Sequence, residues 1–255
     1  MFVNFFEIVI LSIVQGISEF LPVSSSAHLF LISEIYEFKS QALLIDIGLH
    51  LGSLLAIIFY FRNDLLDILN NKSLLFLIIL GSIPLIIFGL IVYKTGLINY
   101  FRNIQVISWT TFVFALTLYL ADKFEVKKKI EADLNIKSIL IIGIFQILAL
   151  VPGVSRSGIV ITAGRLLNFD RYDSTKISFY LSIPAIAGAS FLGLKDILNE
   201  NINFNIGVLI SIIFSFIFSF LTIKYFLIFV KKFTMNLFIF YRIFLSLILF
   251  YIVYF

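Results

Sequence analysis

The chain has 255 residues, of which 61% are hydrophobic and 13% charged, and its formal net charge is +4. A soluble globular domain usually carries about 25% charged residues, so this chain has too little polar surface to fold as a water-soluble sphere. It contains no cysteine, which excludes disulfides and any thiolate nucleophile or metal ligand. Nothing in the charge distribution indicates a nucleic-acid partner. The composition predicts an integral membrane protein.

In chain order, residues 2–36 come first and are apolar at both ends but broken by QGISEFLPVSSSAH at 15–28. Residues 138–167 are broken in the same way by QILALVPGVSRSGIVIT at 146–162. The uninterrupted apolar segments have about the 20 residues that cross a bilayer as helix, and they are 42–61, 73–93, 104–121, 176–194, 206–230 and 237–255. We therefore predict an all-α polytopic membrane protein with six transmembrane helices.

The two broken segments resemble each other. Residues 24–27 match residues 155–158, and Gln15 and Gln146 lie at nearly the same distance upstream of these runs. This predicts a single membrane domain, 1–255, built from an inverted repeat of about 1–121 and 138–255. Broken backbone is tolerated at membrane depth only where protein or a wet cavity surrounds it, so we expect two re-entrant helical hairpins. Broken segments at corresponding positions of two halves indicate a midplane binding site.

The placement of lysine and arginine along the chain predicts how the protein is oriented in the membrane. If the hairpins do not cross, the loops 62–72, 122–137 and 231–236 share one face with the ends of the second hairpin. That face carries twelve lysines and arginines, whereas the opposite face carries four, Lys39, Lys94, Arg102 and Lys195. Cytoplasmic loops are the ones enriched in Lys and Arg, so the richer face, including loop 122–137, is predicted to be cytoplasmic, with both termini outside.

The buried charged residues are the candidates for chemistry, because a charge at the bilayer centre is costly. The pattern buries Glu19, His28 and Arg156, with Gln15 on the same helical face as Glu19. A guanidinium binds two phosphate oxygens as a fork, and small residues before a helix, as at 152–158, leave backbone N–H groups for an anion. A serine nucleophile needs a nearby base, for which Glu19 and His28 both qualify.

Each residue also has a purely structural interpretation. Glu19 and Arg156 would form a buried ion pair, and Ser24, Ser25 and Ser26 would cap the helix that begins near Ala27. His50 is as compatible with packing as with lining a pocket. Asp46, four residues earlier, is a candidate partner for it.

At these residues the sequence resembles the undecaprenyl-diphosphate phosphatase family, the bacitracin-resistance type of membrane phosphatase. The family is marked by (Glu/Gln)-x-x-x-Glu running into Phe-Leu-Pro-Val-Ser-Ser-x-x-His, which here spans 15–28. Its second element, Pro-Gly-x-Ser-Arg-Ser-Gly, here spans 152–158. The resemblance extends over essentially the whole chain.

The resemblance implies hydrolysis of undecaprenyl diphosphate to undecaprenyl phosphate, at a site that opens to the extracytoplasmic side of the bacterial cell membrane. It implies a divalent cation, Mg or Ca, which Glu19 would contact through the substrate diphosphate. The implied catalytic residues are Glu19, Ser25, His28 and Arg156. The substrate-binding candidates are Gln15, Ser24, Ser26, Gly153, Ser155, Ser157 and Thr162. The expected partners are the polyprenyl diphosphate and membrane lipids, and a homodimer is an oligomeric state that the sequence leaves open.

Two departures from the family pattern bear on the site. The family often has glutamate where Gln15 stands, and a glutamine can be neither a base nor a charged metal ligand. The second element commonly continues with threonine three residues after Ser157, where this chain has Val160; Thr162 lies on a different helical azimuth. The alternative function is a transporter or flippase for a polyprenyl phosphate, since inverted repeats with broken helices are typical of transporters.

Overall fold

The computed structural model describes residues 5–36, 42–199 and 206–254, which are almost entirely helical. The elements in chain order are α1 (Phe5–Ser18), α2 (Ser25–Tyr36), α3 (Ala42–Tyr60), α4 (Arg62–Asn70), α5 (Lys72–Thr95), α6 (Ile98–Phe101), α7 (Ile104–Asp122), α8 (Ile130–Asp133), α9 (Ile136–Ile147), the 3₁₀ turn η1 (Leu148–Leu150), α10 (Arg156–Leu166), α11 (Arg171–Asn199), α12 (Ile206–Lys232) and α13 (Asn236–Tyr254). Within the described ranges the predicted all-α fold is confirmed.

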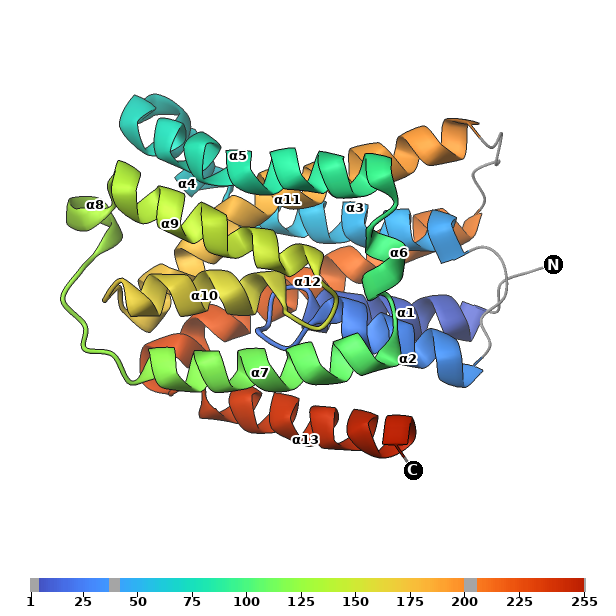
Figure 1. The fold of residues 1–255 in the computed structure, drawn as a ribbon. Coiled ribbons are helices and arrows are strands. Elements are labelled where there is room, and N and C mark those ends of the chain that lie inside the picture. The colour runs from blue at the N-terminus through green and yellow to red at the C-terminus, as the bar shows by residue number, and fades with distance from the viewer. Residues whose placement is uncertain (1–4, 37–41, 200–205, 255) are drawn as a thin grey trace.

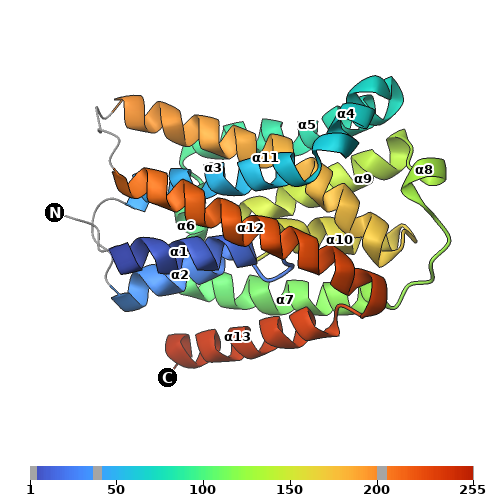
Figure 2. The same cartoon turned by 180° about the vertical axis from the view of Figure 1, so that it is seen from behind.

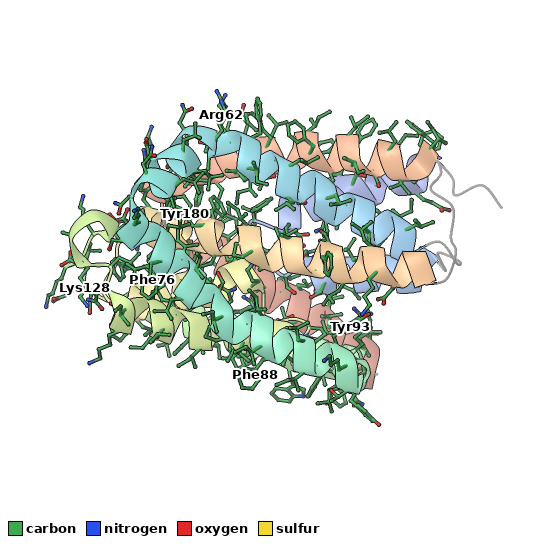
Figure 3. The ribbon with its side chains drawn as sticks, turned by 90° about the horizontal axis from the view of Figure 1, so that it is seen from above. Arg62, Phe76, Phe88, Tyr93, Lys128 and Tyr180 are labelled. Atoms are coloured by element: carbon green, nitrogen blue, oxygen red, sulfur yellow. The ribbon has the colours of Figure 1, made fainter. Side chains whose placement is uncertain are left out.

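Five helices, α5, α7, α11, α12 and α13, are long and apolar enough to cross a membrane. The α3 helix makes a sixth when it is taken together with α4, from which it is separated by a bend of 70° at Phe61. The outward side chains suit lipid: Phe76 and Phe88 on α5 are 53% and 47% exposed (Figure 3). The chain is therefore a multi-pass membrane protein, and all six predicted apolar segments are helices.

The long helices run along one common direction, so the bundle has two ends (Figures 1 and 2). The short helices α4 and α8 lie at one end, with Lys128, and Tyr93 lies toward the other (Figure 3). That second end also holds α6, the start of α1 and the end of α13 (Figure 1). Of the four charges predicted for the poorer face, Lys39 lies outside the described residues.

The two broken segments fold as helical hairpins. The α1 and α2 helices lie side by side, as do α9 and α10. Seen from the front and from behind, the turns of both hairpins lie near the middle of the bundle (Figures 1 and 2). Neither α1 nor α9 runs the whole length of the bundle. Each stops before a turn that contains proline and serine and cannot extend an α-helix.

Small residues bring α12 close to α1 and α3. A Cβ added to Gly16 would lie 2.6 Å from the Phe218 Cβ, and one added to Gly52 would lie 2.4 Å from the Ile212 carbonyl oxygen. Small residues at helix interfaces allow such close approach in membranes. This packing fixes α1 and α3, which carry Gln15, Asp46 and His50, against the core of the bundle.

Candidate active site

The two hairpin turns have the same backbone feature. Ser24 precedes α2 with a φ of 76°, and Ser155 precedes α10 with a φ of 69°. Left-handed conformations cost a non-glycine residue of order 1–3 kcal/mol and cluster at functional sites. In both turns the strained serine lies close to the serine two residues later, since the Oγ atoms of Ser24 and Ser26 are 3.2 Å apart, as are those of Ser155 and Ser157. The residue in between, Ser25 in one turn and Arg156 in the other, starts a helix at the centre of the bundle.

Contacts between the turns bring the two hairpins together. Ser157 donates a hydrogen bond to the Leu21 carbonyl oxygen at 2.6 Å, and Arg156 Nη2 lies 2.9 Å from Glu19 Oε1. The side chains of Arg156 and Glu19 are 12% and 9% exposed, so this ion pair is nearly enclosed. Arg156 also donates from Nη1 to the Ser178 carbonyl at 3.2 Å, which fixes the guanidinium against α11.

Glu19 is the centre of the polar network. Its Oε2 accepts a hydrogen bond from Ser25 Oγ at 2.9 Å and another from Gln15 Nε2 at 3.0 Å, while Oε1 faces Arg156. A serine hydroxyl that donates to a buried carboxylate has a proton acceptor already in place. The structure thus brings together four of the predicted site residues, and it places the carboxylate of Glu19 directly on the hydroxyl of Ser25.

His28 faces away from this network. Its Nδ1 lies 2.6 Å from the Ser24 carbonyl oxygen, and its Nε2 lies 2.6 Å from the Tyr241 hydroxyl of α13. The carbonyl can only accept, so Nδ1 carries a proton in this contact. Both ring nitrogens are therefore occupied by groups other than Ser25. No sequence pattern pointed to Tyr241, which lies 213 residues from His28.

A cavity of about 250 Å³ lies beside Ser25. The residues that line it come from α2, α3, the link between α6 and α7, α7 and the second turn, and they are Ser25, Ser26, Leu29, Asp46, His50, Arg102, Ile107 and Pro152. His50 is thus a lining residue, and its Nδ1 lies 2.9 Å from Gln15 Nε2. Gln15 in turn connects His50 to Glu19, so the glutamine acts as a bridge between two titratable groups.

The second turn is held from behind by α7 and α13. Gly153 has a φ of 89°, and its carbonyl accepts from Thr111 at 3.4 Å and from Arg242 at 3.0 Å. Thr110 donates to the Pro152 carbonyl at 2.6 Å. In the α10 helix, the Gly158 N–H donates to Ser155 Oγ at 3.2 Å, so Ser155 is the N-cap. These interactions occupy carbonyl oxygens of the second turn. They leave the side of the turn that carries backbone N–H groups available to an anion.

Thr162 lies apart from both turns. Its side chain is buried and donates to the Gly158 carbonyl at 2.8 Å, one helical turn back within α10. Its hydroxyl is therefore engaged by its own helix. Val160 is fully buried in the apolar core and contributes no polar group there.

The fold and the site define a class: a polytopic membrane protein in which a serine hydroxyl, a carboxylate and a guanidinium meet inside the bundle, next to a polar cavity. Comparison with known proteins gives the family. The family model described as bacitracin resistance protein BacA matches residues 8–248, so the chain belongs to the BacA family.

Relatives in this family are similar to the chain over nearly its full length. A protein of Pelagibacter ubique is 59% identical over 255 residues, covering 100% of both chains. One of Elusimicrobium minutum is 44% identical over 250 residues, covering 94% of this chain and 95% of its own. One of Saccharophagus degradans is 39% identical over 260 residues and 97% of each chain. All three are named undecaprenyl-diphosphatase.

Proposed function

We propose that this protein hydrolyses undecaprenyl diphosphate to undecaprenyl phosphate and inorganic phosphate, which regenerates the lipid carrier of cell-wall synthesis. Family membership and the names of its relatives support this activity. The single structural observation that carries it is the hydrogen bond from Ser25 Oγ to Glu19 Oε2, beside the Arg156 guanidinium. A transporter needs no nucleophile paired with a base, whereas a phosphatase that forms a covalent intermediate does.

In the proposed mechanism, Ser25 Oγ attacks the terminal phosphorus and its proton passes to Glu19. The bond from that phosphorus to the bridging oxygen breaks, and undecaprenyl phosphate leaves with the bridging oxygen. Glu19 gives that proton to the departing phosphate oxygen and becomes a carboxylate again. Water then attacks the phosphoserine and gives a proton to Glu19, which returns it to Ser25 Oγ as inorganic phosphate is released. Arg156 stabilises the charge on the transferring group, which is the main form of help in phosphoryl transfer.

The binding roles follow from the two turns. Ser155 and the backbone N–H groups that start α10 would bind the phosphate oxygens, since helix N-termini favour anions. Ser157 would contribute its backbone N–H, because its hydroxyl donates to the Leu21 carbonyl. Ser24 and Ser26 lie beside the attacking Ser25. His28 supports the Ser24 backbone through its Nδ1 and does not contact the Ser25 hydroxyl, so we assign the role of base to Glu19.

A divalent cation, Mg or Ca, is part of this proposal. Among the described residues no group of three or more His, Asp or Glu side chains is arranged to hold a metal ion. That donor set suits a cation carried mainly by substrate oxygens, as Mg²⁺ often is, with Glu19 as the nearest carboxylate. When bound, the cation would neutralise charge on the diphosphate.

We further propose six transmembrane helices and two re-entrant hairpins in an inverted repeat, of about 1–121 and 138–255, in the bacterial inner membrane. The equivalent serine geometry of the two turns supports the duplication. The extracytoplasmic opening of the site is supported by the cavity next to Ser25, whose lining includes Arg102. Arg102 directly follows α6, which lies at the end of the bundle opposite α8 (Figure 1).

The proposed function is tested by measuring phosphate release from undecaprenyl diphosphate by the purified protein in detergent, with and without chelator. We expect release by the wild type and a rate at least about a thousandfold lower for Ser25→Ala. Binding of the lipid diphosphate without any release of phosphate would instead favour the transporter alternative.

A further inference from the structure

Arg242 is a fully buried arginine on α13, with an exposed fraction of 0%. Its Nη2 donates to the carbonyl oxygens of Gly153 at 3.0 Å and Val154 at 3.1 Å. Its Nε and Nη1 have no hydrogen-bond partner, and no carboxylate within the described ranges lies within 4.0 Å of it. A buried charge is usually paired with an opposite charge, so this guanidinium calls for an explanation.

The guanidinium lies directly behind the turn that we assign to the diphosphate. A Cβ added to Gly158, in the first turn of α10, would lie 3.0 Å from Arg242 Nη1. The group therefore fills the space between the Gly153–Val154 carbonyls and the start of α10. Its charge lies close to the turn that we assign to the diphosphate, but outside the cavity next to Ser25.

The two carbonyl contacts orient the backbone of the turn. In a trans peptide the C=O and the following N–H point in opposite directions, and the described residues contain no cis peptide. With the Val154 carbonyl directed at Arg242, the Ser155 N–H points to the opposite side. The N–H groups of Arg156 and Ser157 follow it in the first turn of α10, where no intrahelical acceptor is available. Arg242 thereby helps to present three consecutive amides to an anion.

The charges around the two turns do not balance without a ligand. Glu19 is neutralised by Arg156, and Arg242 has no anion beside it among the residues that the structure describes. The Arg242 charge therefore has no counter-charge in contact with it, in surroundings where low polarity makes charge interactions strong. A diphosphate would supply the missing negative charge.

We propose that Arg242 is a positioning residue that holds the Pro152–Ser155 turn in its phosphate-binding form and places a fixed positive charge beneath it. The inference rests on the proposed function of this turn. A purely structural role, in which Arg242 only satisfies buried carbonyls, predicts altered stability without altered anion affinity.

Three substitutions separate charge from hydrogen bonding. Arg242→Lys keeps the charge and one donor group, Arg242→Gln keeps a donor without charge, and Arg242→Met keeps neither. The matched control is Lys224→Met, which removes an exposed lysine from the neighbouring α12. For each variant we would measure the thermal unfolding midpoint, its increase on adding inorganic pyrophosphate, and the inhibition constant of pyrophosphate against phosphate release. A ligand that binds only the folded state raises the midpoint whether or not turnover occurs.

We expect pyrophosphate affinity to fall by about tenfold in Arg242→Met, by less in Arg242→Gln, and by at most about threefold in Arg242→Lys, with no change in Lys224→Met; tenfold corresponds to the loss of one charge-assisted hydrogen bond. Equal affinity in all folded variants would overturn the inference. If Arg242→Met does not fold, the Lys and Gln variants decide, because they differ in charge. A wild type that is stabilised by pyrophosphate but releases no phosphate would refute the proposed function and leave the role of Arg242 standing.

Discussion

Ser24 and Ser155 occupy equivalent positions in two different hairpins and share a left-handed backbone, with φ angles of 76° and 69°. Each directly precedes a residue that hydrogen-bonds Glu19: Ser25 to one carboxylate oxygen and Arg156 to the other, both at 2.9 Å. The strained serines thus direct the start of each helix at the same acidic group. One half of the chain supplies the hydroxyl and the carboxylate, and the other supplies the cation.

The hydroxyl of Ser25 is expected to be indispensable. Ser25→Ala should reduce kcat by at least about a thousandfold, since removal of a nucleophile leaves only the contribution of binding and electrostatics, while the unfolding midpoint stays near that of the wild type. The control is Ser12→Ala, which removes a buried hydroxyl that donates only to the Ile8 carbonyl within α1. Phosphate release by purified protein measures both variants. Substantial turnover by Ser25→Ala would mean that water attacks the diphosphate directly.

Breaking the ion pair of Glu19 with Arg156 should destabilise the protein more than removing both charges. Glu19→Gln leaves a nearly enclosed guanidinium without its anion, and breaking a buried pair by removing one partner costs about 3–5 kcal/mol. Adding Arg156→Met should restore part of that stability without restoring activity. Thermal unfolding in detergent, run on the two single variants and the double variant, gives the coupling energy. A double variant no more stable than Glu19→Gln would show that the pair contributes little.

The assignment of the base makes a separate prediction. Neither ring nitrogen of His28 contacts Ser25, because the Ser24 carbonyl and the Tyr241 hydroxyl occupy them. His28→Ala should therefore lower kcat by less than Glu19→Gln does, and Tyr241→Phe should have a smaller effect still. The three kcat values, measured at saturating lipid diphosphate, rank the roles. If His28→Ala is as inactive as Glu19→Gln, the imidazole must reach Ser25 once substrate is bound.

Much of the fold follows from hydropathy alone, and the core of the site follows from the cost of burying charge. The six apolar segments are helices whose ends lie within a few residues of the predicted ones, except that α11 begins at Arg171 and extends to Asn199, beyond the predicted 176–194. Its amphipathic first turns are less apolar, so hydropathy understates them. Glu19, Ser25 and Arg156 meet as expected, because each lies in a break of an otherwise apolar segment.

Long-range partners could not be predicted in the same way. Arg242 binds the second turn, and the sequence did not predict this contact, because a single charge in an apolar helix gives no information about which neighbour it faces. Similarity between the two broken segments also does not predict which partners their side chains have. Gln146 matches Gln15 when the two broken segments are aligned, but its amide has no hydrogen-bond partner among the described residues, whereas Gln15 joins Glu19 and His50. Side-chain partners depend on which helices pack together, and the spacing of residues does not determine that.

Gly153 should tolerate no side chain. A Cβ there would lie 2.1 Å from Thr110 Oγ1 and 2.8 Å from the Ile107 carbonyl oxygen, and the φ of 89° is strained for any L-residue. Gly153→Ala should therefore lower stability by at least about 2–3 kcal/mol, combining backbone strain with a clash against α7. The control is Gly188→Ala on α11, where a Cβ would meet nothing within 4 Å and alanine should raise helix stability slightly. Thermal unfolding of both variants tests the pair, and a stable Gly153→Ala would mean that the turn can move away from α7.

The orientation of the protein in the membrane can be measured directly by thiol labelling. The chain contains no cysteine, so a single introduced thiol is the only one that is labelled. Lys128→Cys lies at the lysine-rich end of the bundle, and Lys94→Cys lies on α5 at the other end, next to Tyr93 (Figure 3). In right-side-out membrane vesicles, a membrane-impermeant maleimide should label Lys94→Cys and should reach Lys128→Cys only after the vesicles are permeabilised. The reverse pattern would put the lysine-rich loops outside, against the charge asymmetry that orients membrane helices. It would also turn the cavity beside Ser25 toward the cytoplasm, and the diphosphate would then have to be hydrolysed on that side.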